Sequence, residues 1–111
     1  MVNSGIMSSA RVVLTTAGSD EEARKIAHAL VERRLAACVN IVPRIESVYR
    51  WQGKVESAAE WLLIIKTQPA IFDRVRDAIK ENHSYDLPEC IMLEIADGDK
   101  AYLDWLVQNT D

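Results

Sequence analysis

The chain has 111 residues, 49% hydrophobic and 27% charged, which is typical of one ordinary soluble domain and excludes a two-domain enzyme. With 17 acidic residues against 13 Lys and Arg, the formal net charge is −4, so no diffuse basic field exists for phosphate groups and we expect no nucleic-acid partner. The longest apolar stretch, 61–65, is far shorter than a membrane-spanning helix, so we also expect no membrane contact.

The start of the chain and the two cysteines bear on organisation and location. Residues 1–10 have no cationic start and little apolar bulk, so we expect a disordered leader there and a single domain over 11–111. Cys38 and Cys90 lie in separate apolar segments without a C-x-x-C spacing, which favours buried, reduced thiols. Reduced thiols favour a cytoplasmic protein.

A strand and then a helix are predicted at the start of the domain. Residues 11–16 are a short β-branched run. Ser19 and Glu22 have the S-x-x-E form of a capping box, so a helix is expected to begin at Asp20. Apolar residues at helical spacing predict that it ends near Leu35.

A long hairpin is predicted next. Residues 38–52 have β character, and Pro43 interrupts the pattern because it has no N–H for the ladder, so we expect a bulge there. Gly53 supplies a turn, and residues 55–67 return as the second strand.

The last third of the chain predicts a helix, a strand and a short helix. The first helix is expected from Pro69 to near Asn82, the strand over 90–95, and the last helix after a cap at Asp99. The order β-α-β-β-α-β followed by α predicts the α+β class. Its expected form is a ferredoxin-like antiparallel sheet with both long helices on one face.

Three large aromatic residues, Tyr49, Trp51 and Trp61, lie on the predicted hairpin. The hairpin is longer than two helices of this domain can cover, so we expect its aromatic side chains to pack on a neighbouring subunit of a homotrimer. The alternative is a cross-strand aromatic pair within one hairpin.

Five short segments form one ordered pattern along the domain. They are RLAACVNI at 34–41, YRWQGK at 49–54, Glu60 with Lys66 and Thr67, HSYDLPE at 83–89, and YLDWL at 102–106. Together they resemble the signatures of the CutA family, the divalent-cation tolerance proteins, from about Arg11 to Trp105. The resemblance implies a ferredoxin-like homotrimer that binds divalent metals, notably copper, and has no established enzymatic reaction.

Two positions depart from the pattern that this resemblance implies. Ser84 replaces the proline of the usual His-Pro-Tyr loop, which leaves the turn less stiff. Thr15 replaces a cysteine present in some members, which argues against a thiolate copper site.

The loop after the second predicted helix carries the candidate metal ligands. His83 and Glu89 offer nitrogen and oxygen donors suited to Cu(II) or Zn(II). The alternative is that His83 interacts with the last carbonyl groups of the helix. His28, beside the apolar stripe of the first helix, has no partner ligand at i+4 and is interpreted as a surface histidine.

Three further residues of the CutA-like pattern, Glu60, Lys66 and Tyr85, have no obvious core role. Glu60 and Lys66 share parity on one strand, so their side chains leave the same face of the sheet. Beside an intersubunit cleft they are candidates for binding a small anionic or metal-bound ligand. A solvated face is the alternative.

The sequence offers no catalytic constellation: neither a Ser-His-Asp or Cys-His arrangement nor a phosphate-binding loop stands out, and we expect no enzyme. Our first hypothesis is a cytoplasmic homotrimer that binds a divalent metal ion, with Cu(II) foremost, in metal homeostasis. The alternative is a trimeric sensor akin to the nitrogen-regulatory PII proteins, which binds a metabolite in its intersubunit clefts.

Overall fold

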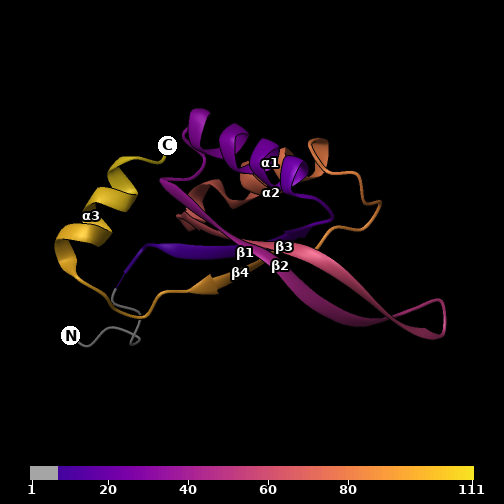
Figure 1. Ribbon diagram of the computed structural model, residues 1–111. Coiled ribbons are helices and arrows are strands. Elements are labelled where there is room, and N and C mark those ends of the chain that lie inside the picture. The colour runs from indigo at the N-terminus through magenta and orange to yellow at the C-terminus, as the bar shows by residue number, and fades with distance from the viewer. Residues whose placement is uncertain (1–7) are drawn as a thin grey trace.

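The computed structural model describes residues 8–111 and contains the predicted order of strands and helices (Figure 1). The four strands form one antiparallel sheet in the order β2-β3-β1-β4, as the ferredoxin-like prediction requires. The elements are β1 Arg11–Ala17, α1 Asp20–Glu32, β2 Cys38–Trp51, β3 Lys54–Thr67, a short 3-10 helix Pro69–Ile71, α2 Phe72–Glu81, β4 Ile91–Glu94 and α3 Lys100–Gln108.

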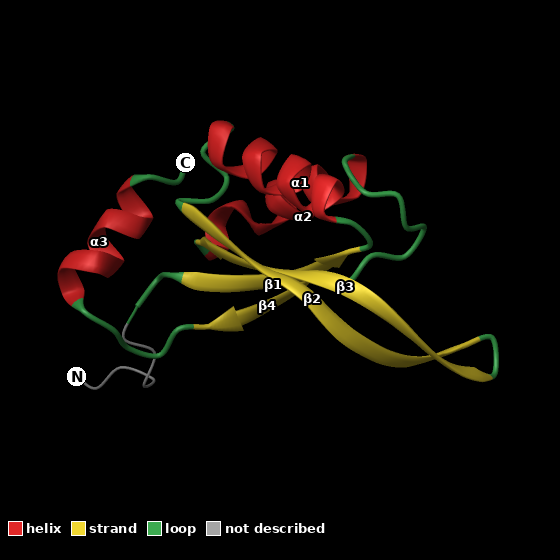
Figure 2. Ribbon diagram, in the orientation of Figure 1, coloured by secondary structure: helices red, strands yellow, loops and turns green. Residues whose placement is uncertain are grey.

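Helices α1 and α2 cover one face of the sheet, while the hairpin of β2 and β3 extends beyond them (Figure 2). The core lies between this face and the two helices, where alternate residues of β1, β2 and β3 point inward. Its largest fully buried side chains include Ile26, Leu30, Leu63, Ile65 and Ile79.

The opposite face of the sheet has no helix over it in the described part of the chain (Figure 2). Residues directly opposite in an antiparallel ladder point to the same side, so the register identifies its members. Its apolar side chains are half-buried or exposed: Val12, Leu14, Val42, Leu62, Ile64, Ile91 and Leu93. We call these seven residues the open sheet face.

Helix α1 begins at Asp20 as predicted, where the Ser19 hydroxyl accepts a hydrogen bond from the N–H of Glu22. The prediction that it ends near Leu35 is wrong, because the helix stops at Glu32. Arg34 takes a left-handed conformation with φ 59°, and the N–H of Leu35 donates to the carbonyl of Leu30. This is a Schellman-type end, built on arginine in place of the usual glycine.

The predicted bulge near Pro43 is confirmed. Val42 pairs with Leu62 and Ile45 with Glu60, so two residues of β2 oppose one of β3. The extra residue reverses which side chains face which side along the rest of β2. As a result, Tyr49 and Trp51, at odd positions of β2, lie on the same face as even-numbered Glu60 of β3.

The later elements lie close to their predicted positions. The segment at Pro69 begins as a 3-10 turn, α2 ends at Glu81, and β4 covers 91–94, inside the expected 90–95. Asp99 caps α3 as predicted, by accepting a hydrogen bond from the N–H of Tyr102. In α3, Leu106 is buried, Leu103 and Val107 are half-buried, and Tyr102 is exposed.

The leader and the cysteines were also predicted from the sequence. Of the leader expected over 1–10, residues 1–7 lie outside the described residues, and Ala10 is buried. Cys38 and Cys90 are both unpaired and half-buried, and burial raises the pKa of the Cys90 thiol. Within residues 8–111, no helix has the length and apolar character needed to cross a membrane.

Candidate functional site

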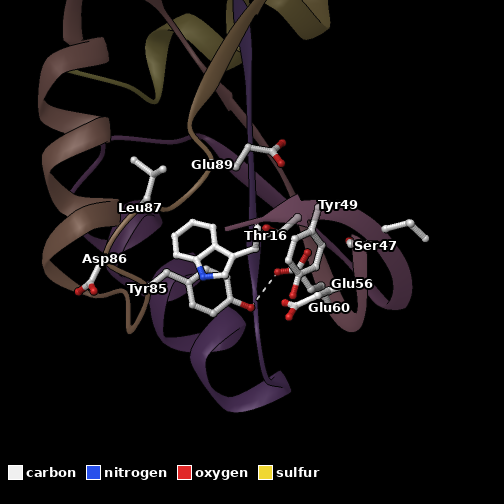
Figure 3. A pocket seen from close by; sticks show the side chains of 11 residues that line it. Thr16, Ser47, Tyr49, Glu56, Glu60, Tyr85, Asp86, Leu87 and Glu89 are labelled. Atoms are coloured by element: carbon white, nitrogen blue, oxygen red, sulfur yellow. Dashed lines mark hydrogen bonds between the residues drawn. The ribbon is translucent and has the colours of Figure 1, made fainter. Parts of the chain in front are cut away.

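A groove of about 720 Å³ lies between the outer half of the hairpin and the loop that follows α2 (Figure 3). The hairpin supplies one wall and the loop the other, with Thr16 of β1 between them. Its lining residues are Thr16, Ser47, Val48, Tyr49, Trp51, Glu56, Glu60, Tyr85, Asp86, Leu87 and Glu89. Five of the predicted site residues therefore meet here from distant parts of the chain: Tyr49, Trp51, Glu60, Tyr85 and Glu89.

The hairpin wall depends on the bulge in β2. Tyr49 pairs with Glu56 and Trp51 with Lys54, so these aromatic rings leave the hairpin on the face that carries Glu56 and Glu60. Without the extra residue between Val42 and Ile45, the two rings would point to the other side.

The loop wall is fixed by His83, whose side chain is fully buried. Its Nε2–H donates to the carbonyl of Thr16 at 2.6 Å, and its Nδ1 accepts a hydrogen bond from the N–H of Tyr85 at 3.1 Å. The ring also packs on Tyr85, with 4.7 Å between ring centroids. Because both ring nitrogens are used, His83 positions Tyr85 and has no free lone pair for a ligand.

Ser84 and Glu22 tie the same loop to α1. The N–H and the hydroxyl of Ser84 both donate to Glu22 Oε1, which also lies 3.2 Å from His83 Nδ1. A proline at position 84 would have neither donor. A proline would restrict the backbone of this loop, as in the usual His-Pro-Tyr sequence. Here the two hydrogen bonds of Ser84 hold the loop in place.

Tyr85 and Glu60 join the two walls. The phenol hydroxyl donates to Glu60 Oε2 at 2.8 Å (Figure 3). Gly18 lies close to this hydroxyl, since a Cβ at that position would be 2.9 Å from the phenol oxygen. Burial, the hydrogen bond to Glu60 and its charge together raise the pKa of Tyr85 to about 12.

We expect Tyr85 to ionise near pH 12 and Glu60→Gln to move its pKa back toward 10.0, because the charge that opposes ionisation is removed. The raised pKa means that the contribution of this hydrogen bond to stability is complete below pH 10.0 and is lost as pH rises through about 12. Rapid-mixing pH titration of phenolate absorbance measures both effects, with Tyr85→Phe assigning the transition. An unchanged transition in Glu60→Gln would show that Glu60 is not the cause.

The groove is strongly acidic. Its lining contains four carboxylates, those of Glu56, Glu60, Asp86 and Glu89, and no Lys, Arg or His. Burial and then the negative charge of Glu60 raise the pKa of Glu89. Glu60 is only 8% exposed and, within residues 8–111, forms no ion pair.

Lys66 does not join the groove. It shares a face with Glu60 as predicted, but it lies near the other end of β3, where its ammonium group donates to Asn40 Oδ1 and lies 3.9 Å from Cys38 Sγ. The groove therefore lacks the cation that an anionic ligand would need.

The remaining predicted residues lie elsewhere. Trp61 is half-buried and packs against the core beneath the helices. Thr15 faces the same core, where its hydroxyl has no hydrogen-bond partner among the described residues. His28 is exposed and lies 3.5 Å from Glu32.

The described residues of one chain do not complete a metal site. Residues 8–111 contain no group of three or more His, Cys, Asp or Glu side chains arranged to hold a metal ion. Of the predicted ligands, Glu89 lines the groove and His83 does not. A metal ion held by Glu60 and Glu89 would need further ligands from water or from another subunit.

Two residues of the site, Glu56 and Glu22, were not predicted from the sequence. Glu56 lies four positions before Glu60 on one strand, so their shared face was a usable signal once the hairpin register was known. Nothing in the spacing connects Glu22 of α1 to a loop 62 residues later.

Comparison with models of known protein families shows which family this chain belongs to. The family model described as CutA1 divalent ion tolerance protein matches residues 11–109. The chain belongs to this CutA1 family.

Individual CutA relatives cover nearly all of the domain. The divalent-cation tolerance protein CutA of Thermus thermophilus is 54% identical over 99 residues, which are 89% of this chain and 96% of the relative. A chloroplastic CutA of Arabidopsis thaliana is 48% identical over 99 residues, and the match spans only 54% of that longer protein. The solved structure of Cut A1 from Thermus thermophilus superposes with a TM-score of 0.90 at 52% identity, over 92% of this chain and 99% of that one.

Proposed function

We propose that this CutA1-family chain binds divalent metal ions, with Cu(II) preferred, as a homotrimer acting in metal tolerance. The observation that carries the proposal is Glu60, a nearly buried carboxylate that forms no ion pair within residues 8–111. A largely buried charge that has no opposite charge beside it is costly, and a bound cation removes that cost.

Glu89 supports the same cation position. Its pKa is raised by burial and by the charge of Glu60, so the two carboxylates repel each other across the groove. A divalent ion between them converts this repulsion into attraction. Cu(II) is favoured among common divalent ions because oxygen and nitrogen sites follow the usual order of affinity, which peaks at copper.

The trimer proposal rests on the open sheet face. Seven apolar side chains lie there without cover from the described part of this chain, and an apolar sheet face is stable only when something packs on it. A closed threefold arrangement buries this face on three copies at once. Tyr49 and Trp51 are proposed to lie at the edge of that contact, where a groove between subunits stays open.

A cytoplasmic location is proposed on the two unpaired cysteines. The names of related proteins include chloroplastic and periplasmic members, so location varies among relatives.

For the metal site we expect Glu60→Gln and Glu89→Gln each to lower Cu(II) affinity roughly tenfold or more, because each removes a charged ligand. Calorimetric titration with buffered Cu(II) measures this at neutral pH. Glu21→Gln removes an exposed carboxylate of α1 and His28→Ala an exposed imidazole, and both are expected to bind like the wild type.

The same titration tests the competing ligand pair, His83 and Glu89. If His83→Ala lost affinity and Glu60→Gln did not, that pair would hold the ion and the loop would have to open to expose the imidazole. If His28→Ala weakened binding as much as Glu60→Gln, the metal would be bound at the surface and the groove proposal would be wrong.

The metabolite-sensor function stays the second candidate because the groove is larger than a metal ion requires. A volume of about 720 Å³ is in the range of small-molecule sites.

A further inference from the structure

Glu22 of α1 is not used in the way that its local sequence motif predicts. It is the Glu of the S-x-x-E capping box, whose carboxylate normally accepts a hydrogen bond from the N–H of the capping Ser. Only half of this box forms. The Ser19 hydroxyl accepts from the N–H of Glu22 at 3.1 Å, but within residues 8–111 the Glu22 carboxylate makes no hydrogen bond to the Ser19 N–H. The carboxylate reaches instead to the loop that follows α2.

One carboxylate oxygen makes three contacts with that loop. Glu22 Oε1 accepts from the N–H of Ser84 at 3.3 Å and from its hydroxyl at 3.2 Å, and it lies 3.2 Å from Nδ1 of His83. The Glu22 side chain is only 17% exposed, so water competes little for these bonds. The start of α1 is thereby joined to a loop 62 residues later, at the same end of the molecule (Figure 1).

We propose that Glu22 is a positioning residue for the metal site. By holding Ser84, it places the next residue, Tyr85, against Glu60 and so raises the affinity of the site for a metal ion. Glu22 does not line the groove, and it acts only through the loop. This inference rests on the metal-binding function proposed above and names a residue that controls it.

The position of Tyr85 is sensitive to a small shift of the loop. Its hydroxyl donates to Glu60 Oε2 at 2.8 Å, and a Cβ at position 18 would lie 2.9 Å from the same phenol oxygen, so the fit is close. A displacement of about 1 Å would break the bond to Glu60 and free the carboxylate to rotate. Groups that orient a metal ligand typically change metal affinity by roughly 10- to 100-fold. Glu22 is one contact further away, so a smaller effect is expected.

Calorimetric titration with buffered Cu(II) compares Glu22→Ala with Glu21→Ala, which removes the same charge from an exposed position in the same helical turn. Glu22→Ala is expected to weaken Cu(II) binding about fivefold, and Glu21→Ala by less than about twofold. Ser84→Ala removes no charge and is expected to weaken binding about threefold, while Ser84→Thr keeps both donors and is expected to recover most of this loss. The double variant with Ala at 22 and 84 is expected to lose no more than Glu22→Ala alone, because both changes remove the same contact.

A second measurement is made on the full chain with a metal chelator and no added metal. The amide proton of Tyr85 is hydrogen-bonded to His83 Nδ1 at 3.1 Å, so its NMR signal reports the position of the loop. Glu22→Ala and Ser84→Ala are expected to move this signal, and Glu21→Ala is not. A general loss of stability would leave the signal of the folded chain in place, so the signal separates positioning from stability.

An unmoved Tyr85 signal in Glu22→Ala would overturn the proposal. Equal losses of Cu(II) affinity in Glu21→Ala and Glu22→Ala would overturn it too, because charge alone would then be responsible. Fully additive losses in the double variant would show that Glu22 does not act through Ser84. A wild type that binds no Cu(II) would end the metal-binding proposal and with it the effect on affinity, and the NMR comparison would then decide the positioning of Tyr85 alone.

Discussion

Ile64→Asp is expected to convert the proposed trimer into single folded chains. Ile64 lies at the middle of the open sheet face, opposite Leu14 on one side and Asn40 on the other. In a trimer, the new carboxylate would be buried without a partner at each of three contacts, at a cost of roughly several kcal/mol per site. The fold of each chain is retained because the side chain points away from α1, α2 and the core. Light scattering on a sizing column is expected to give roughly three chain masses for the wild type and one for the variant.

The matched control is Val31→Asp on α1, where an apolar side chain that is 43% exposed lies away from the open sheet face. It is expected to keep the wild-type mass. Dissociation by Val31→Asp but not by Ile64→Asp would place the contact on the helices. A wild-type protein of one chain mass at micromolar concentration would end the trimer proposal.

The secondary structure was predictable because its signals are local. The capping residues Ser19 and Asp99 determine where two helices begin, and both side chains make the expected bonds. The end of α1 was not predictable in the same way. A left-handed residue after a helix is normally signalled by glycine, whereas here it is Arg34, whose guanidinium group donates to the carbonyl of Gln108. That partner comes from the far end of the chain and leaves no local pattern.

The sequence identified several residues of the candidate site, but it did not show which of them lie together. Two of the three cleft candidates, Glu60 and Tyr85, line one groove together with Glu89, which was predicted as a metal ligand. Lys66 was grouped with Glu60 by the CutA-like pattern and by their shared parity, and parity says nothing about distance along a strand. The two residues are six positions apart on β3, which is roughly 20 Å.

The role of the bulge shows why spacing alone could not tell which face of the sheet carries the aromatic residues of β2. The interruption at Pro43 was visible in the sequence, but its effect on Tyr49 and Trp51 depends on the number of extra residues. One extra residue places both rings with Glu60 on the groove side, and two would not. The number of extra residues is known only from the pairing of β2 with β3.

His83 illustrates how a residue with two interpretations is resolved by its contacts. The metal-ligand prediction concerned a histidine on an open loop, while the observed side chain is fully buried between Thr16 and Tyr85. Neither partner is a carbonyl group at the end of α2, so the alternative interpretation also missed its role. The imidazole links β1 to the loop and thereby sets the position of the Tyr85 hydroxyl.

His83→Ala is therefore expected to lower the free energy of unfolding by about 3 kcal/mol, because it leaves a cavity where a buried ring was and removes the hydrogen-bond partner of the Thr16 carbonyl and of the Tyr85 N–H. His83→Gln is expected to recover part of this loss, since its side-chain amide can still donate to the Thr16 carbonyl, and His28→Ala, at an exposed site, is expected to change little. Urea unfolding at one fixed chain concentration measures all three, because the stability of an oligomer depends on concentration. The loss of stability should be accompanied by a fall in the pKa of Tyr85, since a tyrosine released from Glu60 ionises nearer 10.0. A stable His83→Ala protein that keeps the raised Tyr85 pKa and loses Cu(II) binding would instead show that His83 acts as a metal ligand.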